Sequence, residues 1–375
     1  MRPFALLLLA AAGCIGVPIH AKTNQKPPPE GWRIPYEWVE VKADEETTLR
    51  GIWADNGGPG VVLLYGSAMG IRGVTQFTEI LHDGGYAVLC CDYRGTGFSS
   101  GKWWTSRHLD DDALALVRWV QAKKGGPGGV VGVSIGAVAA TKLPLAEKPP
   151  AAVILDRPVD PRTVIPRFMA GGLGGFAGFV SELLVHPKCD VDLRQSLKDA
   201  KTPTLLVLPE YDFIFPPQDV EYAVAEKAEC VEVKVVGGGH LSSHLVDPVL
   251  WRETVLDFLD RQLRPGQPPV AAGRALPPDP VKVLSYALEK RMLTVELSEP
   301  LPKTIEILAM GPRTNVLIKV EEPTPRMTFE LESKRVKKLT PLFGVRVVPE
   351  GFRTTTGTRR MTLKPVSSPP APPPS

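Results

Sequence analysis

Short apolar runs alternate with amphipathic segments over the first two thirds of the chain. The apolar runs are continuous, which is typical of strands that are covered on both faces. The expected strands cover residues 37–43, 47–54, 60–66, 86–92, 128–134, 151–156, 202–208 and 231–236. Helical spacing predicts helices at 75–84, at 110–124, from about 135, at 217–228 and at 247–263. This alternation predicts an α/β domain at 35–265, with a mainly parallel sheet and helices on both faces.

The pattern changes after this domain. Residues 266–280 are rich in proline and glycine, which cannot extend the preceding helix and instead predict a linker. Beyond the linker, short segments of alternating polar and apolar residues predict an antiparallel β-module at 281–365. The last ten residues, 366–375, form a Pro-rich, low-complexity tail for which we expect disorder.

The N-terminal segment predicts export. The stretch MRPFALLLLAAAGCIGVPIHA combines one basic residue, an apolar run of roughly ten residues and small residues, and the run is too short to span a membrane. Two processed forms fit this signal at residues 1–21. Cleavage after Ala21 gives a soluble protein, whereas Ala11-Ala12-Gly13-Cys14 is similar to a bacterial lipoprotein box, whose use would remove 1–13 and lipidate Cys14. Both interpretations predict a periplasmic, envelope-bound or secreted protein.

Charge is unevenly divided along the chain. The whole chain carries 44 basic and 41 acidic residues, but the stretch from Arg274 to Lys364 carries 17 basic and 10 acidic ones. The densest basic cluster consists of Lys334, Arg335, Lys337 and Lys338, although alternation along a strand would place some of them on opposite faces. This excess has two interpretations: a solvated surface, or a module that docks the protein to an anionic envelope surface without contributing to catalysis. Nucleic acid is not an expected partner, and the oligomeric state is left open.

Cysteine usage gives no sign of a metal site. Cys90 and Cys91 lie in an apolar run and are interpreted as small buried residues, while Cys189 and Cys230 could pair in an oxidising compartment. No Cys/His cluster has the spacing of zinc ligands, so we expect neither a metal nor a cofactor.

A serine lies between two glycines where an expected strand becomes a helix. In Gly132-Val133-Ser134-Ile135-Gly136, a sharp turn would force Ser134 into a strained conformation, and a glycine on each side would relieve the crowding. The hydroxyl would then stand clear of the sheet near the start of a helix. This pattern favours a nucleophilic serine over a small residue that only packs.

A serine nucleophile needs a base and an orienting acid. One late strand is followed by two carboxylates, Glu210 and Asp212, and the next strand is followed by two histidines, His240 and His244. The order of serine, acid and histidine is typical of a strand–loop arrangement in which all three follow strands of one parallel sheet.

Four motifs spread over the first domain carry a family resemblance. They are Gly132–Gly136, the run Asp92–Gly101, Asp212 before FIFPP, and His240 after three glycines. Together they resemble the α/β-hydrolase superfamily, in particular its Bem46-like branch of esterase- and peptidase-like proteins. The resemblance implies the α/β-hydrolase fold, with Ser134 as nucleophile, Asp212 as acid and His240 as base. We interpret the run Asp92–Gly101 as structural.

One motif departs from the family. Its members usually carry His-Gly after the third strand, where this chain has Tyr65-Gly66-Ser67-Ala68. Oxyanion donors are backbone N–H groups, so the change of side chain does not by itself remove them. The resemblance implies that the N–H groups of Ser67 and Ile135 form the oxyanion hole.

A short cap is expected near 160–195, between the sixth strand and the acid. It is apolar and rich in glycine, which fits either a buried helix pair or a lid over an acyl pocket. The candidate pocket residues are Tyr65, Phe168, Phe176 and Phe179.

These motifs lead to one functional hypothesis and two alternatives. The hypothesis is an exported, carboxylesterase-like serine hydrolase that cleaves a small-molecule ester or thioester, or an amide, through an acyl-enzyme. A peptidase or acyltransferase could use the same triad. A non-catalytic envelope binding protein could be built on the same fold, but the complete set of serine, acid and histidine argues against it.

Overall fold

The computed structural model describes most of the chain. It covers residues 26–67, 69–102, 108–160, 162–164, 191–212, 214–240, 242–274, 281–311, 315–340, 342, 344–348, 358–363 and 365. The chain divides into two compact units. The first comprises Met1–Val236 with Val249–Ala275, and the second comprises Gly237–Pro248 with Leu276–Ser375. The segment Gly237–Pro248, which lies within the predicted α/β domain at 35–265, is therefore grouped with the C-terminal region.

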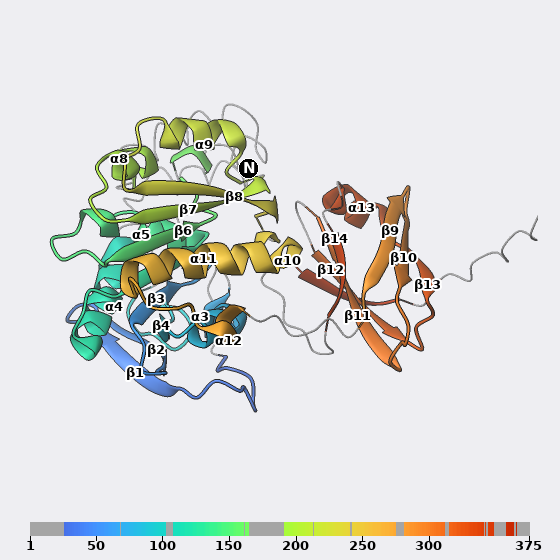
Figure 1. Ribbon diagram of the computed structural model, residues 1–375, viewed down its shortest axis with the longest axis horizontal. Helices are drawn as coiled ribbons and strands as arrows, with labels where there is room; N and C mark the ends of the chain where they lie inside the picture. The colour runs from blue at the N-terminus through green and yellow to red at the C-terminus, as the bar shows by residue number, and fades with distance from the viewer. Residues whose placement is uncertain are drawn as a thin grey trace, which may run out of the picture. The chain divides into compact units, whose positions relative to one another are not determined.

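An eight-stranded sheet forms the centre of the first unit, in the order β1-β2-β4-β3-β5-β6-β7-β8 (Figure 1). Its strands are β1 (Glu37–Lys42), β2 (Thr48–Ala54), β3 (Gly60–Leu64), β4 (Ala87–Cys91), β5 (Gly129–Val133), β6 (Ala152–Asp156), β7 (Thr204–Tyr211) and β8 (Val231–Gly239). Strand β2 pairs antiparallel with β1 and β4, whereas the pairs from β4 through β3, β5 and β6 to β7 are parallel. The predicted α/β class and mainly parallel sheet are confirmed.

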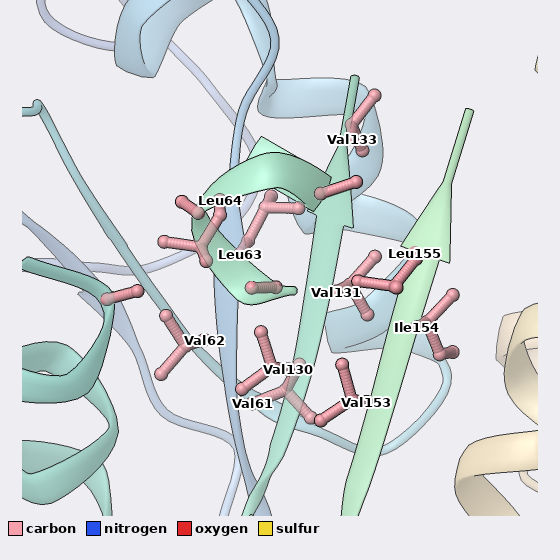
Figure 2. Packing of buried hydrophobic residues seen from close by; sticks show 14 of the residues in the cluster. Val61, Val62, Leu63, Leu64, Val130, Val131, Val133, Val153, Ile154 and Leu155 are labelled. Carbon is pink, nitrogen blue, oxygen red and sulfur yellow. The ribbon is translucent and has the colours of Figure 1, made fainter. Parts of the chain in front are cut away.

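Continuous apolar runs put the central strands in the core. Every residue of β3, β5 and β6 is buried. Figure 2 shows the valines, leucines and isoleucine of these three strands packed beside one another. Burial of one such side chain stabilises the fold by about 1.5–3 kcal/mol, so this region anchors the loops that leave the sheet.

Helices cover both faces of this sheet. They are α2 (Gly70–Gly73), α3 (Thr75–Asp83), α4 (Leu109–Lys124), α5 (Ile135–Ala140), η2 (Leu143–Leu145), α8 (Leu193–Lys198), α9 (Pro217–Val224), α11 (Pro248–Leu263) and α12 (Ala271–Arg274). Helices α4 and α5 contact each other, and α3 and α11 meet through Phe77 and Trp251, whose ring centroids are 5.3 Å apart. A Cβ at Gly60 would contact Val120 of α4, whereas a Cβ at Gly129 would contact Leu259 of α11. The two pairs of helices therefore lie on different faces.

The predicted linker is partly structured. Helix α12 lies within it and contacts α3, where a Cβ at Gly273 would clash with the backbone of Gly84. The last part of the linker, at 275–280, lies outside the described residues. Within the described ranges, no helix is both long enough and apolar enough to cross a membrane.

The second unit contains two small sheets. Their strands are β9 (Val283–Glu289), β10 (Met292–Leu297), β11 (Thr304–Met310), β12 (Asn315–Glu321), β13 (Arg326–Glu330), β14 (Gly344–Val348) and β15 (Thr358–Thr362). The orders are β13-β10-β9 and β14-β11-β12-β15. Strand β10 pairs antiparallel with β9 and β13, and β11 pairs antiparallel with β12 and β14, whereas β12 and β15 are parallel. The predicted C-terminal antiparallel β-structure is confirmed.

The basic cluster of the second unit lies on a helix. Helix α13 (Ser333–Leu339) carries it, with Lys334, Lys337 and Lys338 exposed and Leu339 completely buried. The expectation of strand alternation at this cluster is wrong. One buried leucine anchors the helix, and its exposed positions take the lysines.

Candidate functional site

Ser134 lies in a strained turn between β5 and α5. Its φ of 55° and ψ of −113° are sparsely populated by residues with a side chain. Gly132 and Gly136 permit this turn, since a Cβ at Gly132 would lie 2.5 Å from the Gly136 oxygen and one at Gly136 would overlap the Leu64 oxygen. Such a conformation costs about 1–3 kcal/mol and persists where the surroundings impose it. The predicted strand–serine–helix turn is present.

The turn is tied to its neighbours through the backbone. The Ser134 N–H donates to the Asp156 carbonyl oxygen at 2.8 Å, and the Ser134 carbonyl oxygen accepts from Ala137 N–H at 2.9 Å. Ser134 is half-buried, and Ile135 is the first residue of α5. The first amides of a helix have no acceptor within that helix, so the Ile135 N–H is suited to bind an oxyanion.

The second candidate donor belongs to the loop that follows β3. A Cβ at Gly66 would lie 3.5 Å from the Cβ of Ser134, so the loop passes directly beside the serine. Ser67 follows Gly66 and is half-buried. The two residues expected to form the oxyanion hole, Ser67 and Ile135, therefore belong to segments that flank Ser134.

A buried network holds this loop. The Tyr65 hydroxyl donates to Asp92 Oδ1 at 2.8 Å and accepts from Tyr93 N–H at 3.2 Å. The Tyr93 hydroxyl donates back to the Tyr65 carbonyl oxygen at 2.8 Å. Asp92 Oδ1 also accepts from Ile71 N–H at 3.3 Å, and Oδ2 accepts from Phe98 N–H at 2.9 Å. Burial raises the pKa of Asp92, and the hydrogen bonds from Phe98, Tyr65 and Ile71 oppose that rise.

The network changes the interpretation of Tyr65. The side chain is completely buried, and its hydroxyl is committed to Asp92. Tyr65 is therefore a core residue that supports the loop, and its expected place in the wall of a pocket is corrected. Tyrosine at this position is long enough for its hydroxyl to reach Asp92 through the core.

The run Asp92–Gly101 has the structural role that was expected of it. Arg94 is 5% exposed and donates from Nε to Asp112 Oδ1 at 2.9 Å and from Nη1 to Asp44 Oδ2 at 3.0 Å. Gly97 has a φ of 50°, and a Cβ there would overlap the Asp92 carboxylate. The turn therefore needs glycine at this position.

Asp212 follows β7 directly. Its side chain is buried, and Oδ1 accepts from Ile214 N–H at 2.8 Å and from Phe215 N–H at 3.1 Å. Glu210 lies within β7 and is exposed. Because β5, β6 and β7 are parallel, Asp212 and Ser134 leave the same edge of the sheet. Burial at the end of a strand and a fixed carboxylate favour Asp212 over Glu210 as the orienting acid.

His240 follows β8 directly and belongs to the second unit. It is 4% exposed, in a turn where Gly239 N–H donates to Ser242 Oγ at 3.1 Å and Ser242 N–H donates to the Gly239 oxygen at 2.9 Å. His244 lies in the next helix, α10 (Ser243–Val246), and is also buried. The chain therefore places His240 at the end of a strand and His244 within a helix.

One buried ion pair at this edge of the sheet had not been singled out from the sequence. Asp156 ends β6, and its Oδ2 accepts from Arg157 Nη2 at 2.8 Å and from Trp251 Nε1 at 3.2 Å. Arg157 has a φ of 53°, and its N–H donates to the Val207 oxygen at 2.8 Å. The pair lies between the strands of Ser134 and Asp212. Its sequence signal, an Asp-Arg-Pro after an apolar strand, resembles an ordinary turn.

Several expected features lie outside the described residues. They are the signal at 1–21 with Cys14, most of the cap near 160–195 with Phe168, Phe176 and Phe179, Cys189, and the tail at 366–375. Cys90 and Cys91 are buried, as expected. Cys230 is a free thiol whose Sγ donates to the Ala200 oxygen at 3.2 Å, so it forms no disulfide. In the described part of the chain, no three His, Cys, Asp or Glu side chains are grouped as metal ligands.

Comparisons with known proteins agree with this architecture. Residues 18–161 match the family model described as X-Pro dipeptidyl-peptidase (S15 family). Human protein ABHD12B is 29% identical over 229 residues, which cover 55% of this chain and 62% of that protein. Esterase Pf2001 of Pyrococcus furiosus is 24% identical in one crystal form, with a TM-score of 0.55 over 65% of this chain and 99% of that one. A second crystal form is 23% identical with a TM-score of 0.56, over 65% and 97% of the respective chains. The sheet order, the nucleophile turn and these similarities together show that the chain has the α/β-hydrolase fold.

Proposed function

We propose that this protein is a serine hydrolase that cleaves an ester or thioester through an acyl-enzyme. The observation that carries the proposal is the strained, positive-φ conformation of Ser134 between Gly132 and Gly136, at the carboxyl end of a central parallel strand. A strained serine in this position is the usual nucleophile of the fold. The similarity to the Pyrococcus esterase structure supports the fold only. The chemistry is assigned from the residues of this chain.

In the proposed reaction, His240 removes the proton from Ser134 Oγ as the oxygen attacks the carbonyl carbon. Asp212 orients the imidazole and stabilises its charged form, while the N–H groups of Ser67 and Ile135 bind the oxyanion. The tetrahedral intermediate expels the alcohol or thiol, which takes its proton from His240. Water, deprotonated by His240, then attacks the acyl carbon; the bond to Ser134 Oγ breaks, Ser134 takes the proton back from His240, and the acid is released. No metal or cofactor takes part in these steps.

A peptidase is the second candidate, because the matched family model describes an X-Pro dipeptidyl-peptidase. The same residues would cleave an amide, with His240 protonating the departing amine. An acyltransferase would differ only in the acceptor that attacks the acyl-enzyme. Substrate preference therefore separates these candidates, and the triad does not.

Two measurements test the proposal. A fluorophosphonate probe should modify Ser134, as located by mass spectrometry, and the Ser134→Ala variant should not be labelled. The same two proteins are then assayed with p-nitrophenyl esters of increasing acyl length and with Xaa-Pro p-nitroanilides. If the wild-type protein hydrolyses the esters and the Ser134→Ala variant does not, the esterase proposal is supported. If the wild-type protein prefers the anilides, the peptidase proposal is supported. Equal turnover by the Ser134→Ala variant refutes both.

We further propose that the protein is exported, from the composition of residues 1–21, and that helix α13 docks it to an anionic envelope surface. Mass analysis of protein from the native host should find an N-terminus at Cys14, with added lipid mass, or at Lys22. An N-terminus at Met1 would contradict export. Replacement of the three exposed lysines of α13 by glutamine should weaken salt-sensitive binding to anionic vesicles, and unchanged binding would contradict docking.

A further inference from the structure

The four-stranded sheet of the second unit is apolar on both faces. Along β12, Val316, Ile318 and Val320 belong to the core that the two small sheets share. Leu317 points to the opposite face, as residues of odd and even number must on a strand. Leu308 and Met310 of β11 and Val348 of β14 join Leu317 there. These four side chains are at most 6% exposed, so something covers this second face.

The cover is the helix that follows His240. Leu245 of α10 is 2% exposed and packs in one cluster with Leu308, Met310, Leu317 and Val348, and Val246 packs against the same cluster. A polar contact adds to it, since Arg346 Nη1 of β14 donates to the Leu245 carbonyl oxygen at 3.3 Å. Helix α10 has only four residues and cannot be stable by itself. Its position therefore depends on the sheet.

The turn that carries His240 is packed against this helix. Gly238 has a φ of 90°, and a Cβ at this residue would lie 2.9 Å from Cγ2 of Val246 and 3.2 Å from Cα of Ser243. Ser242 bonds to Gly239 through both its backbone N–H and its hydroxyl, and its carbonyl oxygen accepts from Leu245 N–H at 2.8 Å and from Val246 N–H at 2.9 Å. Ser242 is completely buried. Contacts of Gly238, Gly239 and Ser242 therefore join the end of β8, where His240 follows, to α10.

We propose that the C-terminal β-module is a positioning element of the catalytic machinery: its second sheet face fixes the turn that presents His240. The proposal rests on the assignment of His240 as the base of the proposed hydrolase. It gives the module a role that the sequence-based docking hypothesis excluded. Packing at Leu317 and Leu308 acts on the reaction only through α10, so these residues are positioning residues.

A matched pair of variants on β12 tests this role. Leu317→Ala removes a buried side chain from the face that contacts α10, and Ile318→Ala removes one of equal size from the other face. Both should lower the thermal midpoint to a similar extent. At a temperature below the unfolding transitions of both variants, Leu317→Ala should lower kcat by about 10- to 100-fold and leave KM within about threefold of the wild-type value. Misplacement of a catalytic group by about 1 Å costs up to 10²-fold in rate. Ile318→Ala should keep kcat within about twofold. Leu317→Met, which conserves volume, should recover most of the activity.

Amide hydrogen exchange gives a readout that does not depend on activity. In the full-length protein, a peptide covering Gly237–Pro248 should exchange at least about tenfold faster in Leu317→Ala than in Ile318→Ala. Equal exchange in the two variants would overturn the coupling, whatever the protein catalyses. Faster exchange with an unchanged kcat would overturn the positioning role. If the wild-type protein neither turns over substrates nor is labelled at Ser134, the proposed function is wrong, and the module then has no catalytic role. The exchange result would still show whether the β-module stabilises the segment Gly237–Pro248.

Discussion

Replacement of Tyr65 by phenylalanine removes one oxygen from the buried network that holds the Gly66–Ser67 loop. The hydroxyl donates to Asp92 at 2.8 Å and accepts from Tyr93 N–H at 3.2 Å, and both Tyr65 and Tyr93 are completely or almost completely buried. A hydrogen bond to a charged group contributes about 1.5–3 kcal/mol. Loss of the acceptor for the Tyr93 amide adds to this cost. We expect the free energy of unfolding at pH 7.5 to fall by about 2–4 kcal/mol.

Tyr93→Phe is the matched control. Its hydroxyl also makes a 2.8 Å hydrogen bond in the same cluster, but the acceptor is the neutral carbonyl oxygen of Tyr65. A neutral hydrogen bond contributes about 0.5–1.5 kcal/mol. Tyr93→Phe should therefore lower the free energy of unfolding by about 1 kcal/mol, and by the same amount at every pH.

The pH dependence of the Tyr65→Phe effect has a definite sign. Burial already raises the pKa of Asp92, and the Tyr65 hydroxyl opposes that rise by donating to the ionised form. Without the hydroxyl, the pKa of Asp92 in the folded state rises further. An acid whose folded pKa is raised loses stabilisation as pH climbs above its unfolded value, about 3.9 for aspartate. The destabilisation should therefore be small near pH 4, grow through the raised pKa, and level off above it.

Urea unfolding of the three proteins between pH 4 and pH 8 measures these differences. In the same proteins, kcat for the preferred ester should fall about tenfold in Tyr65→Phe, less than the 10²–10³-fold loss of a complete oxyanion donor, because the loop is loosened and not removed. A Tyr65→Phe effect no larger than that of Tyr93→Phe, or one independent of pH, would refute the assignment of the Tyr65–Asp92 bond as a charged support of the loop.

Two further pairs of substitutions follow from the site. Asp212→Asn should lower kcat by about 10⁴-fold, as replacement of a triad acid does. Glu210→Gln, at an exposed position, should change kcat by less than about tenfold. The reverse ranking in steady-state assays would identify Glu210 as the acid. Gly136→Ala should lower the free energy of unfolding in urea by more than about 3 kcal/mol, because the new methyl group would overlap the Leu64 carbonyl. Gly126 has open space around it, so Gly126→Ala should change the free energy of unfolding by less than about 1 kcal/mol. Similar values for the two variants would contradict the close approach of α5 to β3.

Local patterns in the sequence determined the sheet and the nucleophile turn. The runs that became β3, β5 and β6 are continuous in valine, leucine and isoleucine, and only a strand covered on both faces tolerates that composition. The need for glycine at position 132 is likewise local, because a Cβ there would clash with the backbone of Gly136 and Ala137, whereas the need for glycine at position 136 comes from Leu64 of β3. Order along the chain then supplied Asp212 and His240, since each directly follows a strand.

Contacts between residues distant in the chain were decided only by the tertiary structure. Tyr65 reads as a pocket residue by its place in the motif, and only the approach of Asp92, 27 residues away, shows that its hydroxyl supports the loop. The Lys334–Lys338 cluster was expected on a strand because a segment this short has no decisive period, and its backbone hydrogen bonds, such as that from Thr340 N–H to the Val336 oxygen, show a helix.

The grouping of His240 with the β-module has the same cause. Residues along β12 alternate between its two faces, but the sequence does not say what covers the face that carries Leu317. That cover comes from Leu245, more than sixty residues earlier, across a linker that separates the two segments in sequence. A sequence pattern reports which surfaces must be buried, and the partner of each surface is chosen by the fold as a whole, because burial is gained from any apolar surface of matching shape.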